Sequence, residues 1–373
     1  MGSRRRKRRR FPRRYTTIEY YECIGYNAKG QGVVIFNDKP FNVDELLLGE
    51  KARMIVYFEE EESGEARAVD IKDPSPDRVL PLGHPKFSLG SYHIPHMSEK
   101  AQDAWKQSRV EDLFNLKAEP IKVGKRINYR NKVVLHDGGF FPPGKGRRFA
   151  VIPTSEQWDL MELDFEKYSE TKADIIIRRL DDEISGKPGE QLFANHTMLG
   201  KKFIVNLNSF YQVNTEMAEV AYKDIIAEIP ENAIVYDLFG GAATIGIHVS
   251  DKAKYVYSVE INKDSHKDAL QNIKINNIEN VEAICDDANL WVKNNSKNAD
   301  VVIFDPARSG LAEESARAIN ESNVEKILYL SCNIESQKRD IDLLTNYKID
   351  KVQPYDFFPQ TYHIENLIVL TKK

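Results

Sequence analysis

The sequence predicts an α/β protein: a parallel, doubly wound, Rossmann-like sheet behind a small N-terminal β-barrel of the OB type and a small central α+β region. Three observations carry this prediction. Short β-like runs crowd residues 19–73, as they do in small barrels. From about residue 201, strand-like runs alternate with segments of helical spacing, which is typical of parallel sheets. One such strand is followed by the glycine-rich turn GGAATIG, the arrangement at the ligand-binding end of these sheets.

The predicted barrel is preceded by a strongly basic arm. Residues 1–14 (MGSRRRKRRRFPRR) hold eight Arg and one Lys, a charge of +9, so a net charge of −4 leaves −13 on the remaining chain. An arm of this composition meets phosphates or stays disordered. The acidic body argues against indiscriminate nucleic-acid binding. Four strands are expected in the barrel, at Tyr20–Ile24, Gly32–Phe36, Ala52–Phe58 and Ala66–Ile71, separated by charged or Gly-containing turns.

Composition excludes several classes of protein. The 373 residues are 41% hydrophobic and 29% charged, as in soluble globular proteins. No apolar run has the length of a membrane span, and no apolar segment follows the basic arm as in a secretory signal. Cys23, Cys285 and Cys332 lie far apart, which favours neither a disulfide framework nor a zinc site. We expect a cytoplasmic protein.

The rest of the chain alternates helices and strands after a Pro-rich linker at 73–81. A helix is expected at 99–117, and 123–200 mixes β-like runs with Gly/Pro loops. Apolar spacing predicts further helices at 214–229 and 262–277. The expected strands of the large sheet are AIVYDLF, KYVYSVE, VEAIC, DVVIFDP, KILYLSC and the final LIVLTKK.

The turn after the first of these strands predicts a nucleotide-like cofactor. Glycine lets a ligand approach the backbone, and the following helix start offers free N–H groups. Glu260 ends the next strand, where a carboxylate can accept bonds from ribose hydroxyls. Asp287 follows the third strand and could face an adenine amino group; adjacent Asp286 is an alternative. No P-loop lysine pattern is present, so S-adenosylmethionine is favoured over ATP.

A lone thiol stands at the end of another strand. Cys332 lies in YLSCN, directly after the apolar run VEKILYL. Free cysteine is often a small core residue. The end of a strand in an α/β sheet is different, because ligands bind outside the carboxyl ends of the strands. Cys332 is therefore a candidate nucleophile, whereas Cys23 and Cys285 are expected to be structural.

Five segments resemble motifs of the uracil-5 RNA methyltransferases. They are DLFGGAATIG, FDPARSGL, YLSCN followed by Arg339-Asp340, FPQTYHIE and SFYQVN. The N-terminal barrel resembles the TRAM domain of the ribosomal-RNA members. The resemblance implies a class I, S-adenosylmethionine-dependent methyltransferase domain.

The resemblance also implies roles for individual residues. Cys332 corresponds to the nucleophile and Glu365 to the base that removes a proton, and Arg308 matches an arginine of the catalytic pocket. Asp305 belongs to both the catalytic and the cofactor group. The remaining predicted cofactor contacts are Gln212, Phe239, Gly241, Thr244, Glu260 and Asp287.

Two departures from the family are visible. Many members bind an iron–sulfur cluster through cysteines after the barrel, but Gly83, Leu89 and Tyr92 stand at those positions, and such a cluster needs thiolates. We therefore predict no cluster and no metal, with His84, His93 and His96 as polar loop residues. Segment 83–98 should instead be held by packing of Phe87, Leu89, Tyr92, Ile94 and Met97. In the glycine turn, Ala243 occupies a glycine position and could tighten the pocket.

The sequence thus predicts transfer of a methyl group from S-adenosylmethionine to C5 of uridine, with 23S ribosomal RNA as the favoured substrate because of the barrel and the arm. The alternatives are a tRNA uracil-5 methyltransferase acting on a T-loop and a catalytically silent RNA-binding assembly factor, against which Cys332 and Glu365 speak. We expect a monomer without a membrane partner. The predicted domains are a tail (1–18), the barrel (19–74), a central RNA-binding domain (75–98 and 123–200) and the methyltransferase domain (99–122 and 201–373).

Overall fold

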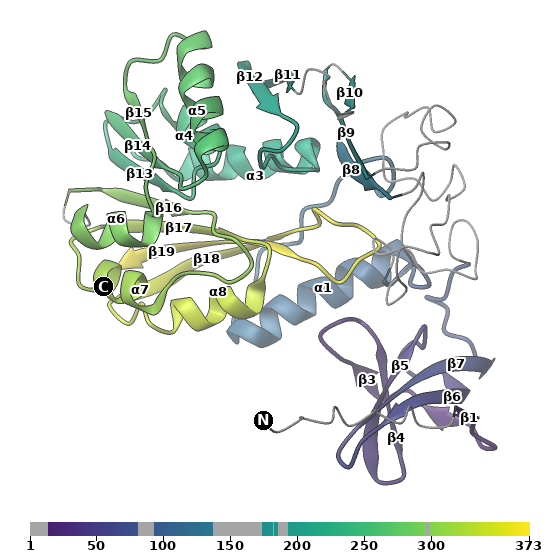
Figure 1. Cartoon of the computed structure of the whole chain (residues 1–373). Helices are drawn as coiled ribbons and strands as arrows, with labels where there is room; N and C mark the ends of the chain where they lie inside the picture. Colours follow the sequence, from purple (N-terminus) through teal and green to yellow (C-terminus); the bar gives the residue numbers. More distant parts are fainter. Residues whose placement is uncertain (1–13, 81–92, 137–173, 182, 186–192, 296–297) are drawn as a thin grey trace, which may run out of the picture. The chain divides into compact units, whose positions relative to one another are not determined.

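A computed structural model describes residues 14–80, 93–136, 174–181, 183–185, 193–295 and 298–373 (Figure 1). The chain divides into two compact units, each described here by itself. The first comprises residues 1–82, 92–105 and 360–362; the second comprises 83–91, 106–359 and 363–373. The basic arm up to residue 13, and His84, Phe87, Leu89 and Tyr92 of the predicted loop, lie outside the described residues. The predicted domain boundaries stay predictions.

The first unit contains the predicted β-rich domain. Its sheet has the strand order β1-β6-β7-β5-β4-β3, with β2 paired to β6. Its strands are β1 (Tyr15–Thr16), β2 (Tyr21–Glu22), β3 (Gly25–Tyr26), β4 (Gly32–Phe36), β5 (Lys39–Asp44), β6 (Lys51–Glu59) and β7 (Gly64–Lys72). Alternating residues of these strands, including Val34, Val43 and Met54, form an apolar core. Cys23 is buried in that core, as expected of a structural thiol.

The segment after the linker also packs by apolar contact. Ile94 and Met97 are buried with Leu47 and Trp105 in one cluster, as predicted for these two residues. The helix α1 (Glu99–Phe114) follows. Its Gln102 exchanges two hydrogen bonds with Gln360: the Gln102 amide donates to Gln360 Oε1 at 2.9 Å, and Gln360 N donates to Gln102 Oε1 at 3.1 Å. These bonds hold Gln360 in a left-handed conformation, with φ of 65°.

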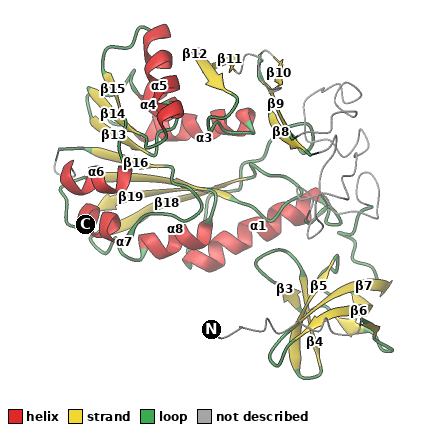
Figure 2. Cartoon of the chain, in the orientation of Figure 1, coloured by secondary structure: helices red, strands yellow, loops and turns green. Residues whose placement is uncertain are grey.

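The second unit is built on a seven-stranded sheet with the order β15-β14-β13-β16-β17-β19-β18 (Figure 2). Its strands are β13 (Ile234–Leu238), β14 (Tyr255–Val259), β15 (Val281–Ile284), β16 (Val301–Phe304), β17 (Lys326–Ser331), β18 (Tyr347–Tyr355) and β19 (Glu365–Lys372). The first five run parallel, which confirms the predicted doubly wound α/β class. Strand β19 differs from the all-parallel prediction, because it is antiparallel to both β17 and β18. Strand β18 therefore runs in the same direction as the first five strands.

Helices cover both faces of this sheet. Alternate residues of each strand point to opposite faces, so Val301 and Ile303 belong to one apolar cluster and Val302 and Phe304 to the other. The first face is covered by α3 (Thr215–Glu228), α4 (Thr244–Val249) and α5 (Lys263–Ile275). The second is covered by the end of α1, α6 (Ala288–Asn295), α7 (Glu313–Asn320) and α8 (Ile334–Ile341).

Two smaller sheets precede the large one. Strands β8 (Lys132–Leu135), β9 (Ile175–Arg179) and β10 (Glu183–Ser185) form an antiparallel sheet, and β11 (Phe193–Met198) pairs with β12 (Lys201–Asn206) in a hairpin. The chain then enters α3, whose first turn is capped by the Asn214 side chain. Among the described helices, none is both long and apolar enough to cross a bilayer.

Candidate active site

The glycine turn after β13 needs its two glycines for different reasons. A Cβ on Gly240 would lie 2.2 Å from Ser258 Oγ and 2.8 Å from Asp237 Oδ2, so a side chain would displace buried polar groups. Gly241 has open space around it but a φ of 57°, a conformation that glycine adopts without the steric cost of a Cβ. The turn is therefore shaped by close packing at one residue and by backbone conformation at the next.

Ala243, which the resemblance puts at a glycine position, adopts a left-handed conformation, with φ of 57°. A left-handed alanine costs about 1 kcal/mol. Its methyl group is fully buried in the apolar cluster under α3 and α4, so the packing offsets part of this cost. Ala243 is not among the residues that line the adjacent pocket. The expected tightening of the pocket is therefore not what the side chain does here; it fills the core.

A small pocket lies in front of this turn. It brings together five residues predicted from sequence: Gln212, Phe239, Gly241, Thr244 and Asp305. The rest of its wall is mainly aromatic or backbone, from Phe210, Tyr211, Tyr222, Gly240, Ala242 and Ile245. Gln212 Nε2 donates to Asp305 Oδ2 at 3.4 Å. No Lys or Arg lines this pocket in the described part of the chain, so it suits an uncharged nucleoside better than a triphosphate.

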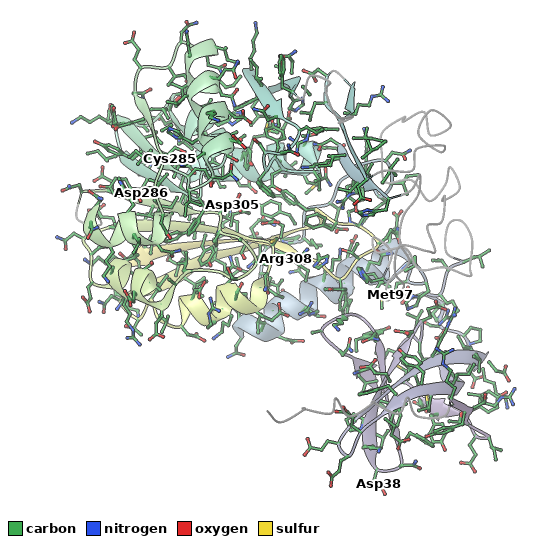
Figure 3. All side chains as sticks on the ribbon, viewed as in Figure 1. Asp38, Met97, Cys285, Asp286, Asp305 and Arg308 are labelled. Carbon is green, nitrogen blue, oxygen red and sulfur yellow. The ribbon has the colours of Figure 1, made fainter. Side chains whose placement is uncertain are left out.

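The two acids predicted to hold a ribose and an adenine have different positions. Glu260 Oε2 accepts from Gly241 N at 3.0 Å, so this carboxylate is tied to the glycine turn. Asp287 Oδ1 accepts from Asn289 N at 2.8 Å at the start of α6, which is a helix-capping contact, and Asp287 does not line the pocket. Figure 3 labels exposed Asp286 and Cys285 at the end of β15. An adenine contact by Asp287 or Asp286 stays a prediction.

Strand register brings the predicted catalytic residues together at the carboxyl ends of the parallel strands. The β17–β19 pairing ends at Ser331 opposite Asn366, so the next position places Cys332 opposite Glu365. Asp305 directly follows β16, whose last residue pairs with Tyr329 of β17. Three neighbouring strands thus deliver a thiol and two carboxyl groups, and Asp305 also lines the pocket.

Arg308 follows Asp305 on a loop that is fixed from α8. Asn333 Nδ2 donates to Arg308 O at 2.9 Å, and Asn333 Oδ1 caps the first turn of α8. Asp340 Oδ2 accepts from Leu311 N and from the Tyr329 hydroxyl, both at 2.7 Å. At the tip of its side chain, Arg308 Nη2 lies 3.3 Å from His363 Nε2. Arg308, which Figure 3 labels, therefore lies on a loop that is hydrogen-bonded to Asn333, and its guanidinium interacts with the Cys332 thiol.

In the protein without bound ligands, the environment of the site disfavours the ionised forms of Cys332, Asp305 and Glu365. The pKa of the Cys332 thiol is raised to about 12, first by burial and then by the charges of Glu365 and Asp305, while Arg308 opposes the shift. Burial also raises the pKa of Asp305, with a contribution from Asp237. Burial, and then the charge of Asp305, raise the pKa of Glu365, while the charge of Arg308 lowers it. Near neutral pH the thiol is therefore protonated, and Arg308 is the cation that favours its ionisation.

Alkylation of Cys332 should reveal this raised pKa. The thiolate is the reactive form, so a thiol with pKa of about 12 should gain about tenfold in rate per pH unit from about pH 7 to about pH 10. An ordinary peptide thiol would level off near about pH 8.5. We would follow the Cys332 peptide by mass spectrometry in a Cys285→Ser protein treated with iodoacetamide. A plateau below about pH 9 would contradict the prediction.

The loop between β18 and β19 is anchored by a buried ion triad. Asp356 accepts from Lys106 Nζ at 2.6 Å and from Arg126 Nη1 at 2.7 Å. The side chains of Lys106 and Asp356 are fully buried, and Lys106 Nζ also donates to Phe358 O at 3.1 Å. The triad therefore fixes the point where the chain leaves β18 on its way to Glu365.

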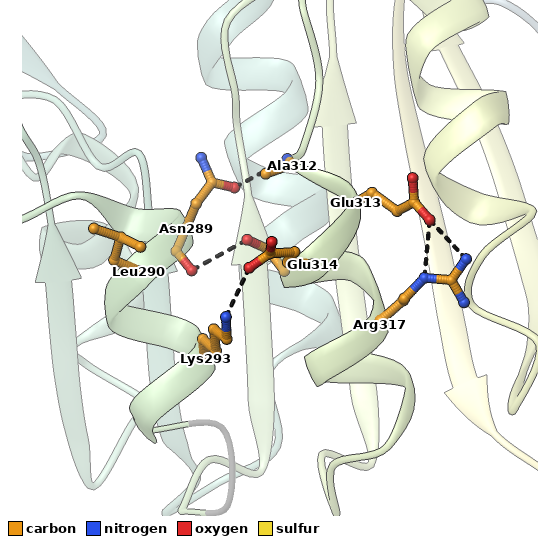
Figure 4. Close-up of a pocket in the computed structure, with 8 residues that line it drawn as sticks. Asn289, Leu290, Lys293, Ala312, Glu313, Glu314 and Arg317 are labelled. Atoms are coloured by element: carbon orange, nitrogen blue, oxygen red, sulfur yellow. Dashed lines mark hydrogen bonds and ion pairs between the residues drawn. The ribbon is translucent and has the colours of Figure 1, made fainter.

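A second hollow lies on the surface between α6 and α7 (Figure 4). Its polar groups satisfy one another: Lys293 pairs with Glu314 at 2.7 Å, and Arg317 pairs with Glu313 at 2.7 Å. Asn289 Oδ1 accepts from Ala312 N at 3.1 Å. The hollow holds none of the predicted site residues and is not the candidate site.

Sequence reasoning missed three contributors to the site. Asn333 could have been found, since an Asn directly before a helix is a capping signal. Tyr211 and Tyr222 line the pocket but carry no comparable signal. Tyr222 reaches the pocket from α3, through packing between elements that are distant in sequence.

Comparisons with known proteins agree with this geometry. A sequence model described as tRNA (Uracil-5-)-methyltransferase matches residues 189–373. An uncharacterised RNA methyltransferase of Mycoplasma mobile is 36% identical over 363 residues, covering 95% of this chain and 99% of that protein. One from Streptococcus pyogenes is 38% identical over 214 residues, or 53% of this chain and 46% of that protein. The chain thus spans nearly the whole of one relative and under half of the other.

A solved structure shows the same fold. The tRNA (uracil-54, C5)-methyltransferase of Pyrococcus abyssi, in complex with S-adenosyl-L-homocysteine, superposes with a TM-score of 0.74 at 19% identity, covering 94% of this chain and 99% of that one. The near-complete match to the mycoplasmal relative, together with the family motifs at the strand ends, settles the family. This chain belongs to the RNA uracil-5 methyltransferase family of S-adenosylmethionine-dependent enzymes.

Proposed function

We propose that this protein methylates C5 of a uridine in RNA through a transient covalent bond between Cys332 and the base. The observation that carries the proposal is the register of β17 and β19, which ends at Ser331 opposite Asn366. The next residues of the two strands are Cys332 and Glu365, whose side chains interact, and Asp305 lines the pocket at the same end of the sheet. A nucleophile and a positioned carboxyl group on neighbouring strands are what covalent catalysis with proton removal requires.

The pocket fits S-adenosylmethionine by the chemistry of its wall. Phe239, Tyr211 and Tyr222 offer apolar surface, the glycine turn admits close approach, and Glu260 is positioned by Gly241 N. When bound, this cofactor supplies an electrophilic methyl group. The side chains of Gln212 and Asp305, which contact each other at 3.4 Å, would hold it on the side of the catalytic residues.

Each catalytic residue then has one task. Cys332 Sγ adds to C6 of uracil, which makes C5 nucleophilic; Arg308 favours the thiolate and can balance charge that develops on the base. After C5 has been methylated, Glu365 takes the C5 proton, and the electron pair of that C–H bond expels the thiolate from C6. The base must leave its stack for this chemistry, since the attack needs the face of the ring.

Ribosomal RNA is the substrate that we favour. The β-rich first unit and the basic residues 4–14 suit a large folded RNA, where phosphate contacts supply affinity. Transfer RNA is the second candidate, because the matching family and the Pyrococcus abyssi enzyme are both described as acting on tRNA.

Mapping 5-methyluridine in ribosomal and transfer RNA of a deletion strain tests both candidates. We expect one ribosomal 5-methyluridine to disappear and to return with the wild-type gene but not with a Cys332→Ala copy. Loss confined to the T-loop of tRNA would replace the ribosomal assignment with the second candidate. If every 5-methyluridine survives the deletion, the proposed activity is wrong.

A further inference from the structure

Two cations face each other on the small sheet that precedes the large one. The register of β8 and β9 places Lys132 directly opposite Arg178, an arrangement of like charges that weakens a sheet. Among the described residues, no carboxylate forms an ion pair with either side chain. The carboxylate of Asp268 interacts electrostatically with Arg178. Both of its oxygens, however, accept hydrogen bonds from Asn206, one from the backbone N and one from the side-chain amide. The pair therefore carries positive charge that the described part of the protein does not neutralise.

Arg178 is committed to the protein interior. Its side chain is fully buried, with Nη1 donating to Asn206 O at 3.2 Å and Nη2 donating to Ser209 O at 3.0 Å. These carbonyls belong to the segment that leads into Tyr211 and Gln212 of the pocket wall. Arg178 thus holds the wall in place and cannot itself reach a ligand, whereas half-buried Lys132 keeps part of its surface accessible.

The residue before Lys132 is hydrogen-bonded to the segment that forms the pocket wall. Asn131 N donates to Val213 O and Asn131 Nδ2 donates to Gln212 O, both at 2.8 Å. Gln212 in turn donates to Asp305. The strand that carries Lys132 is therefore attached, through the preceding residue, to the segment that forms the pocket wall.

We propose that Lys132 binds a backbone phosphate of the RNA next to the target uridine, with Arg178 as the positioning residue beneath it. The inference rests on the proposed function, because it requires an RNA strand that enters the site. A uridine that reaches Cys332 brings its flanking phosphodiesters to this wall. A cation without a protein counter-ion is the group that a phosphate would neutralise.

The environment of Lys132 gives this contact a pH dependence. Burial, and then the charge of Arg178, together lower the pKa of Lys132 to about 8. The other charged or titratable groups near the pair, Tyr211 and Asp268, interact with Arg178. Because the cationic form binds phosphate, RNA affinity should be full below about pH 8 and fall as the pH rises through that value. Bound phosphate favours the proton on Lys132 and would shift this fall to higher pH.

The test compares Lys132→Gln and Lys132→Arg with wild type in RNA-binding and methylation assays over salt and pH. Lys132→Gln should raise Kd and KM for RNA, leave kcat at saturating RNA nearly unchanged, and reduce the slope of log affinity against log salt by about 0.7 to 0.9. Lys132→Arg keeps its charge at every pH, so its affinity should stay flat where that of wild type falls. Lys117→Gln, on an exposed residue of the same unit, is the matched control and should behave as wild type.

Several outcomes overturn the inference. One is a Lys132→Gln protein with the salt slope of wild type, and another is a Lys132→Arg protein with the pH profile of wild type. Misfolding is separable, because Lys132→Gln removes a like-charge contact and should melt no lower than wild type. A wild-type protein that binds RNA but methylates no uridine would refute the proposed function instead, and the binding comparison would still decide the role of Lys132.

Discussion

A Glu365→Gln protein is expected to accumulate a covalent adduct with RNA that the wild-type protein releases. Neither the addition of Cys332 to C6 nor the transfer of the methyl group to C5 requires the Glu365 carboxylate. The removal of the C5 proton does require it. Glutamine keeps the shape of the side chain without its basicity, so turnover should fall by about 10²- to 10⁴-fold. On denaturing gels, labelled RNA should co-migrate with the protein after incubation with S-adenosylmethionine.

The Cys332→Ala protein provides the opposite result. Without the thiol no bond to C6 forms, so both turnover and adduct should vanish while S-adenosylmethionine still binds. The double variant Cys332→Ala/Glu365→Gln should also give no adduct. Glu321→Gln, a change of the same kind on an exposed residue, should turn over normally. Full turnover by the Cys332→Ala protein would remove the covalent mechanism.

Removing the Asp356 carboxylate should have the largest effect on stability. Asp356→Ala leaves the ammonium of Lys106 fully buried without its counter-ion, a change that costs about 3–5 kcal/mol. Urea unfolding followed by circular dichroism would measure the loss. The triple variant Lys106→Met/Arg126→Met/Asp356→Leu should recover much of it, since apolar replacement of a buried ion pair or triad is often neutral.

An exposed ion pair supplies the control for this experiment. Arg317 and Glu313 also lie 2.7 Å apart, but on the solvent face of α7, where water screens their attraction. Glu313→Ala should therefore shift the unfolding midpoint only slightly. The proposed role of the triad fails if Asp356→Ala is no more destabilising than Glu313→Ala.

The predicted large sheet followed from apolar runs, and its two unpredicted features have physical causes. Strand β18, YKIDKVQPY, carries charged residues and Pro354, so its pattern is not that of a buried strand. The structure places β18 at the sheet edge, where proline is tolerated. The insertion of β19 between β17 and β18 joins residues far apart in the chain, and no single-strand pattern specifies such a pairing.

The candidate site also contains residues that the sequence predicted and residues that it did not. Cys332, Asp305 and Glu260 could be placed from sequence because each follows or ends a strand, and strand ends of one sheet converge. Asp287 also follows a strand, but its carboxylate is used to start α6. Local capping competes with ligand contact for such residues, and the sequence does not say which prevails. Tyr222 reaches the pocket only because helix and sheet pack together.

Asn333 sets how far this motif can vary. Its side-chain Oδ1 accepts hydrogen bonds from the first turn of α8, and its Nδ2 donates a hydrogen bond to Arg308 O. One short side chain must therefore accept and donate hydrogen bonds at the same time. Aspartate would preserve the helix start but has no N–H, and serine is too short to do both; glutamine has both groups on a longer arm. The residue after the proposed nucleophile is therefore restricted by the two hydrogen bonds that its side chain must make. Among engineered variants of this strand end, position 333 should tolerate the least replacement outside the reacting groups themselves.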